Sequence, residues 1–230
     1  EGTVSGCTIQ QFQNGIAVSA DGEWARFKIV DNRIIDIVGV GGGPASASTD
    51  GEDRGDGIVV WGAQATITGN VVSCKSGSDA RIGIHCEGLP GFAGTPGNYS
   101  SAQYTISDNI VYGQFRRGIS VEDVSEAAVT GNTVADSTWW AVSLAAACRA
   151  SHLTGNTILW TRTAADNQGS AFTPQRAPIM AYGTTHDSVI AGNTIRIAGA
   201  AAAAIIVQGV DGSNRGTDTI VSGNTWYVES

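Results

Sequence analysis

Short apolar motifs recur along the whole chain, and each ends at a residue suited to a turn. Every copy carries apolar residues followed by a small or polar residue and, in all but the first, an asparagine. The copies are TVSGC (3–7), KIVDN (28–32), TITGN (66–70), TISDN (105–109), AVTGN (128–132), HLTGN (152–156), VIAGN (189–193) and IVSGN (220–224). Their last positions lie 25, 38, 39, 23, 24, 37 and 31 residues apart. A constant motif with variable spacing predicts a solenoid whose loops differ between coils.

A second repeat alternates with the first. Its copies are GIAV (15–18), GIVV (57–60), GIHC (83–86), GISV (118–121), AVSL (141–144), PIMA (178–181) and AIIV (204–207). Each begins with a small residue or proline and has apolar side chains at its second and fourth positions. This period of two predicts short strands with one buried face. A residue two places after each asparagine is apolar as well, so every coil contains at least two strands and little helix is expected.

Coils of short strands stacked in register form a parallel β-solenoid, here of about seven coils. Equivalent residues of successive coils then lie about 4.8 Å apart. An asparagine at each turn can therefore hydrogen-bond to the asparagines above and below it. We expect a structural ladder of Asn32, Asn70, Asn109, Asn132, Asn156, Asn193 and Asn224. Cys7 is expected to end it as a small buried substitute.

The G-I-x-V strand followed by V-T-G-N-T-V resembles the right-handed parallel β-helix repeat of the pectate-lyase-like superfamily. This superfamily includes polysaccharide lyases, glycoside hydrolases, alginate epimerases and phage tailspikes. The resemblance covers nearly the whole chain and implies one all-β domain over residues 1–230, which we expect to be a piece of a longer protein. It does not select one activity, because the repeated residues are core and turn residues.

Composition narrows the choice of partners. The net charge is −8 and only 15% of the residues are charged. A nucleic-acid partner or an anionic membrane would need a basic surface, so neither is expected. No segment has the length of a membrane span, and no signal peptide is evident. The four cysteines have no zinc-site spacing, so buried free thiols are expected, with one disulfide between Cys74 and Cys148 left open.

The working surface is predicted from the loops and from the strand motif. Insertions at 39–56, 87–103, 160–177 and 208–218 are expected to wall a groove, because loops carry function more often than the scaffold does. The third and fifth positions of the strand motif should face that groove. In the central coils these positions hold Trp61, His85, Glu87, Ser120, Glu122 and Tyr182. Aromatic rings beside carboxylates suit a polysaccharide.

Glu87 and Glu122 occupy the same column on consecutive coils, with backbones about 4.8 Å apart. Like charges at this spacing raise one pKa and place an acid beside a base or nucleophile. Retaining glycosidases hold their carboxyls about 5–5.5 Å apart, which suits this pair. We therefore predict Glu87, Glu122 and His85, a proton relay, as catalytic. Predicted substrate-binding residues are Trp61, Ser120, Tyr182, Arg116 and Arg117.

Other interpretations stay open at this point. The glutamates can be solvated charges neutralised by Arg116 or Arg117. The acidic run 50–56 suggests calcium, but a solvated loop explains it better. A lyase or epimerase on uronates would use the basic residues Arg81, Arg116 or Arg117. A non-catalytic structural or receptor-binding module whose faces pack into a homotrimer is the main alternative to an enzyme. The resemblance implies an extracellular, cell-surface or virion location.

Overall fold

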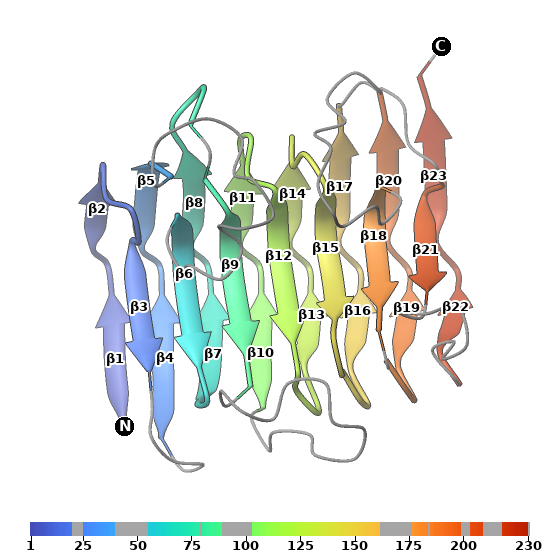
Figure 1. Cartoon of the computed structure of the whole chain (residues 1–230), viewed down its shortest axis with the longest axis horizontal. Helices are drawn as coiled ribbons and strands as arrows, with labels where there is room; N and C mark the ends of the chain where they lie inside the picture. Colours follow the sequence, from blue (N-terminus) through green and yellow to red (C-terminus); the bar gives the residue numbers. More distant parts are fainter. Residues whose placement is uncertain are drawn as a thin grey trace.

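The computed structural model describes residues 1–19, 25–39, 55–78, 80–88, 103–161, 176–183, 185–198, 203–208 and 218–229. These residues form three parallel β-sheets that run side by side along the molecule (Figure 1). Each complete coil contributes one strand to each sheet, and equivalent strands of successive coils are hydrogen-bonded neighbours. No helix occurs in this part of the chain. The predicted fold, a right-handed parallel β-helix, is confirmed.

The strands follow the same order in every coil. Sheet A contains β1 (Gly2–Ser5), β4 (Arg26–Val30), β7 (Gln64–Thr68), β10 (Tyr104–Ser107), β13 (Ala128–Thr130), β16 (His152–Thr154), β19 (Val189–Ala191) and β22 (Ile220–Ser222). Sheet B contains β2 (Thr8–Gln10), β5 (Arg33–Ile37), β8 (Val71–Cys74), β11 (Ile110–Tyr112), β14 (Thr133–Ala135), β17 (Thr157–Trp160), β20 (Thr194–Ile197) and β23 (Thr225–Val228). Sheet C contains β3 (Ile16–Ser19), β6 (Asp56–Trp61), β9 (Ile82–Glu87), β12 (Arg117–Glu122), β15 (Trp140–Ala145), β18 (Ala177–Tyr182) and β21 (Ile205–Gln208).

The asparagine repeat forms the corner between sheets A and B. The backbone nitrogen and Nδ2 of Asn70 both donate to Oδ1 of Asn109, at 3.0 and 2.9 Å. Nδ2 of Asn109 also donates to the carbonyl oxygen of Ile67 at 2.9 Å. The same pattern continues from Asn32 to Asn224. The ladder therefore pairs amide groups that the corner buries, as predicted.

The residue before each asparagine is glycine or aspartate for a conformational reason. Gly69 and Gly131 both have φ 68°, and Asp31 and Asp108 have φ 55° and 56°. This left-handed region disfavours most side chains, but glycine and aspartate tolerate it. The sharp corner thus explains why the motif reads G-N or D-N.

The small first position of the sheet C motif is a packing requirement. A Cβ added to Gly83 would lie 2.4 Å from Cγ1 of Val111 and 2.6 Å from the carbonyl oxygen of Gly118. Gly57 and Gly118 meet the same obstacles in their own coils. Sheet C therefore passes too close to sheet B for a larger residue at this point.

The apolar second and fourth positions fill one continuous core between the three sheets. Cys86 lies in this core, as predicted, and all four cysteines are free. The prediction for Cys7 was wrong: its backbone nitrogen donates to Oδ1 of Asn32, but the residue is exposed. No coil of the described part lies beyond it to cover the thiol. No helix among the described residues is long and apolar enough to cross a membrane.

Most of each predicted insertion lies outside the described residues. This holds for 40–54, 89–102, 162–175 and 209–217. The greater part of the acidic run that suggested calcium falls in the first of these segments.

Candidate functional site

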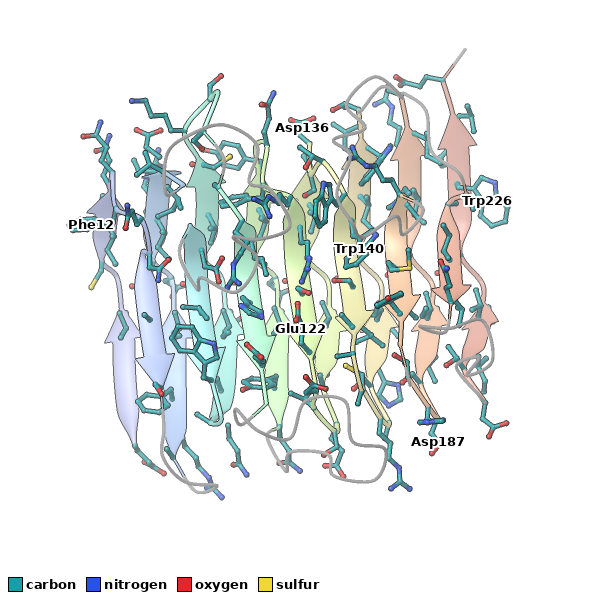
Figure 2. The ribbon with its side chains drawn as sticks, viewed as in Figure 1. Phe12, Glu122, Asp136, Trp140, Asp187 and Trp226 are labelled. Carbon is teal, nitrogen blue, oxygen red and sulfur yellow. The ribbon has the colours of Figure 1, made fainter. Side chains whose placement is uncertain are left out.

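The outer face of sheet C brings the two predicted acids together. Glu122 of β12 is the register partner of Glu87 of β9, and Ser120 is the partner of His85. Trp61 of β6 continues the Glu87 column on the other side. Figure 2 shows Glu122 on the face of the helix turned toward the viewer. The sequence therefore predicted the column correctly.

The third positions of the motif point away from the core but are not open to solvent. His85 is only 2% exposed, and Ser120, Ser143 and Met180 are fully buried. The expectation that His85 and Ser120 line the surface directly was wrong. His85 and Ser120 belong to a polar network with the side chains of neighbouring positions, which the alternation of the strand could not reveal.

A buried ion pair lies at the base of this network. Asp56, fully buried at the start of β6, accepts from Nε of Arg81 at 2.9 Å and from Nη2 at 2.6 Å. Its Oδ1 also accepts from the backbone nitrogen of Ile82, at 3.2 Å. Nδ1 of His85 lies 3.1 Å from Oδ2 of Asp56. A bidentate pair of this kind fixes both partners, and it orients the imidazole as well.

The other imidazole nitrogen faces both glutamates. Nε2 of His85 lies 3.7 Å from Oε2 of Glu87 and 3.6 Å from Oε1 of Glu122. This nitrogen is buried and has no hydrogen-bond partner. The glutamate side chains are 27% and 18% exposed, whereas that of His85 is 2% exposed. The site is thus a layered arrangement, with Asp56 innermost, His85 in the middle and two carboxylates outermost.

Glu122 has its own set of partners. Its Oε1 accepts from Nη1 of Arg117 and from the hydroxyl of Ser120, which lies 2.8 Å away. The Ser120 hydroxyl also lies 2.9 Å from that of Ser143 on the next coil. Burial alone would raise the pKa of Glu122, but the charges of Arg117 and His85 and the Ser120 bond outweigh it and lower the pKa. Glu122 is therefore ionised, and repulsion from Glu87 does not make it an acid.

Burial and hydrogen bonding also have opposite effects on the pKa values of His85 and Asp56. Burial alone would lower the pKa of His85, but the hydrogen bond to Asp56 and the charge of Glu122 raise it above its ordinary value. Burial would likewise raise the pKa of Asp56, but the hydrogen bonds from His85 and Arg81 hold it below that value. When His85 carries its second proton, three acids face three bases. These are Asp56, Glu87 and Glu122 with Arg81, Arg117 and His85.

Aromatic residues extend the face toward the later coils. Trp140 lies above Glu122 on the front of the helix in Figure 2, and the Arg117 guanidinium lies 5.0 Å from its ring centroid. The Tyr182 ring is 6.2 Å from Trp140. The Arg116 guanidinium lies 5.4 Å from the ring centroid of Trp139, and Arg117 is paired with Glu122. Both tryptophans are buried and pack with Met180 outside the main core.

Sequence reasoning missed Asp56 and Arg81 as parts of the site. Asp56 was assigned to an acidic loop, and Arg81 was considered only as a lyase base. Each precedes a G-I strand motif, at positions 57 and 83, and the register pairs Asp56 with Ile82, next to Arg81. The sequence does contain an indication of this pair. A charged residue directly beside a buried strand needs a partner of opposite charge, because burying an unpaired charge is unfavourable.

The raised pKa of His85 predicts how stability depends on pH. Because the folded state binds this proton more tightly, the stabilisation is complete below the ordinary pKa of 6.5 and is lost as pH rises through the folded value. Glu122 and Asp56 have lowered pKa values, so their contribution is complete above about pH 4.5 and is lost on acidification. Urea unfolding should show the highest stability between about pH 4.5 and 6.5.

His85→Gln should flatten the decline above pH 6.5, while the exposed His152→Gln should leave it unchanged. Equal slopes for wild-type protein and His85→Gln would contradict the assignment of this titration.

Comparison with known proteins identifies the family. Residues 41–207 match the family described as "Periplasmic copper-binding protein (NosD)". The chain belongs to the NosD family. This match runs from β6 into β21 and includes the whole network around His85. No curated protein and no solved structure matches the chain. NosD membership agrees with the β-helix, while the chemistry of this chain has to be argued from its own site.

Proposed function

We propose that this NosD-family β-helix binds a polysaccharide across the outer face of sheet C and hydrolyses it at Glu87 and Glu122. One observation carries the proposal. Two carboxylates from consecutive strands face a single buried imidazole nitrogen that has no hydrogen-bond partner. A polar atom left unpaired in a buried site costs stability, and such costs concentrate where function needs them.

The surroundings of the two glutamates favour different roles. Arg117 and Ser120 hold Glu122 ionised, as a nucleophile or base requires. Glu87 is the more exposed of the two and lies beside the imidazolium, so it can receive a proton from His85 and pass it outward. Asp56 keeps that imidazole charged and oriented. Both oxygens lie within 3.7 Å of one nitrogen, an arrangement that admits the carboxyl separation of about 5–5.5 Å used by retaining glycosidases.

The proposed reaction has two balanced steps. In the first, a Glu122 oxygen bonds to the anomeric carbon while the glycosidic carbon–oxygen bond breaks, and the leaving oxygen takes a proton from Glu87. In the second, water gives a proton to Glu87 and its oxygen bonds to the anomeric carbon, which releases Glu122 as a carboxylate. His85 passes its proton to Glu87 before the first step and takes it back after the second, so His85 and Asp56 are the same at the end of the cycle as at its start. Trp61 and Tyr182, on either side of the pair, offer rings on which sugars can stack.

The family description raises copper as a ligand, and the residues of this chain do not fit it. All three histidines, all four cysteines and the one methionine lie within the described residues. In this part of the chain no group of three or more His, Cys, Asp or Glu side chains is placed to hold a metal. Copper favours imidazole and sulfur ligands. Burial raises the pKa of Cys74 to about 11 and of Cys148 to about 12, so both remain thiols, and metals bind the thiolate. No step proposed here uses copper.

The family description also names the periplasm, and we extend an extracytoplasmic location to this chain. That compartment is where a bacterial protein would meet exported polysaccharides. Association into trimers stays a prediction, which light scattering on the purified chain checks. Calcium stays a prediction too, although Asp56 is already engaged by Arg81 and His85.

The catalytic proposal is tested with Glu122→Gln on a panel of capsular and plant polysaccharides. We expect cleavage to fall about a hundredfold or more, because the amide is neither a nucleophile nor a base. Glu229→Gln is the matched control, since that residue is an exposed glutamate paired with Arg196 at the end of the helix. It should retain full activity, and both variants should unfold at concentrations of urea close to those of the wild-type protein.

Other outcomes point to the alternatives. A new ultraviolet absorbance from an unsaturated product would identify a lyase instead of a hydrolase. Absence of cleavage by the unmutated chain on the whole panel would favour a non-catalytic module. In that case the carboxylates and His85 would serve only to neutralise one another.

A further inference from the structure

The column of third positions on sheet C is polar only in three consecutive coils. From the first coil to the last it reads Ala17, Val59, His85, Ser120, Ser143, Met180 and Ile206. The coils on either side show that apolar residues fit this position. Burying a hydroxyl group costs stability unless it is hydrogen-bonded. The fully buried Ser120 and Ser143 therefore have a purpose that the packing of the strands does not supply.

The partners of Ser120 determine the direction of the hydrogen bonds between these serines. A hydroxyl group has one proton to donate and two lone pairs that accept. Glu122 is ionised, so its Oε1 only accepts, and the Ser120 hydroxyl 2.8 Å away donates to it. The Ser120 proton is then used. In the 2.9 Å contact between the two Oγ atoms the donor is therefore Ser143, and the hydrogen bonds run from Ser143 to Ser120 to Glu122.

Ser143 begins this series of hydrogen bonds. Its register partner in the next coil is Met180, which is fully buried and whose thioether has no proton to donate. β15, the strand that contains Ser143, carries no charged side chain. The influence of β15 on the Glu122 carboxylate is therefore exerted through a hydroxyl group and not through a charge.

The charges that act on Glu122 come from its own strand and from the strand on its other side. They belong to Arg117 of β12, to His85 and Glu87 of β9, and to Arg81 directly before β9. None of these side chains is a printed partner of either serine. A change at Ser143 thus leaves the charged groups in place and alters only the hydrogen bond that Ser120 donates.

We propose that Ser143 is a positioning residue, whose hydroxyl holds Ser120 in the orientation that donates to Glu122. A hydroxyl group that receives a hydrogen bond donates a stronger one, because each bond polarises the next. Ser143 is fully buried and acts only through its neighbour, so its part in the reaction rests on the proposed function of Glu122. The serine pair stabilises the Glu122 carboxylate more than an uncharged ester, which favours release of Glu122 in the second step.

The test is a carbon-13 NMR titration of the Glu122 carboxyl group in the full chain, with its signal assigned from its absence in Glu122→Gln protein. In Ser120→Ala protein Glu122 should bind a proton about tenfold more tightly, because a charge-assisted hydrogen bond is lost. In Ser143→Ala protein the increase should be about twofold, because an incoming hydrogen bond strengthens the next by roughly 10–30%. Ser143→Thr keeps the hydroxyl group and should restore the wild-type proton affinity.

Ser151→Ala is the matched control for the loss of a buried hydroxyl group. Ser151 is fully buried, accepts from the backbone nitrogen of Ala127 at 3.2 Å and donates to the carbonyl oxygen of Arg149 at 3.1 Å. Its removal should destabilise the chain more than Ser143→Ala does, because a buried backbone donor loses its acceptor. The proton affinity of Glu122 should nevertheless stay at the wild-type value.

A double substitution shows whether Ser143 acts through Ser120. Ser120→Ala/Ser143→Ala should raise the proton affinity of Glu122 no further than Ser120→Ala alone. Additive effects of the two substitutions would overturn the proposal. So would a wild-type proton affinity in Ser143→Ala protein, or an equal change in Ser151→Ala protein.

These titrations need no substrate, so they test the serine pair separately from cleavage. With a cleaved polysaccharide, the acidic limb of the pH profile of kcat/KM should move to higher pH in Ser143→Ala and return in Ser143→Thr. If that limb stayed in place while the proton affinity of Glu122 changed, Glu122 would not be the nucleophile. The proposed function would then fail although the hydrogen bonds of the serine pair had been confirmed.

Discussion

Asp56→Asn is expected to lower the free energy of unfolding by about 3 kcal/mol, one of the largest effects of any single substitution in this chain. The amide can still accept the hydrogen bond from the backbone nitrogen of Ile82, so the local backbone keeps its partner. What disappears is the negative charge facing Arg81 and His85. A buried cation left without its counter-ion is strongly unfavourable. Urea unfolding at pH 6 measures the loss.

A matched substitution separates burial from charge. Asp187→Asn removes the same charge from an ion pair with Arg149 whose side chains are 57% and 51% exposed. Exposed pairs contribute about 0–1 kcal/mol, so this variant should be almost as stable as the wild-type protein. The Asp56 variant should also lower the pKa of His85, which nuclear magnetic resonance can follow. If both variants lost the same small amount of unfolding free energy, burial would not make the charge of Asp56 more important for stability than that of Asp187.

Asn109→Ala is expected to cost a similar amount, about 3 kcal/mol, for a different reason. Its Oδ1 accepts from the backbone nitrogen of Asn70, and its Nδ2 donates to the carbonyl of Ile67. Both groups are buried, and alanine supplies neither a donor nor an acceptor. Each buried polar group without a partner costs about 1–3 kcal/mol, and a cavity adds to this.

The end of the ladder provides the comparison. Asn224 accepts from Asn193 in the same way but is only half-buried, so water can replace the lost bonds. Asn224→Ala should therefore cost about 1 kcal/mol. Thermal unfolding followed by circular dichroism checks both variants. If the two substitutions destabilised the chain equally, the ladder would act through corner conformation and not through buried hydrogen bonds.

Asn109 and Asp56 stabilise different parts of the molecule. The ladder stabilises the corner between sheets A and B, and this corner sets the register of every coil. The register in turn places Glu87 beside Glu122 and Asp56 one coil below Ile82. A scaffold defect at Asn109 would therefore disturb the polar network from a distance, whereas a defect at Asp56 would leave the coils in place.

The amino-acid sequence by itself determined the coils, the asparagine corner and the column that contains Glu87 and Glu122. These features follow from local rules: a period of two for strands, a left-handed corner at glycine or aspartate, and one residue type repeated at each turn. Stacking in register then carries a local pattern through the whole molecule, which is why so much could be predicted.

Only the tertiary structure decided which side chains meet on the outside of that scaffold. Asp56 and Arg81 lie 25 positions apart in the chain, and Arg117 reaches Glu122 across its own strand. Long side chains choose their partners by reach and by the cost of burial, and no spacing rule encodes either. The same reason explains why His85 is buried although it points outward.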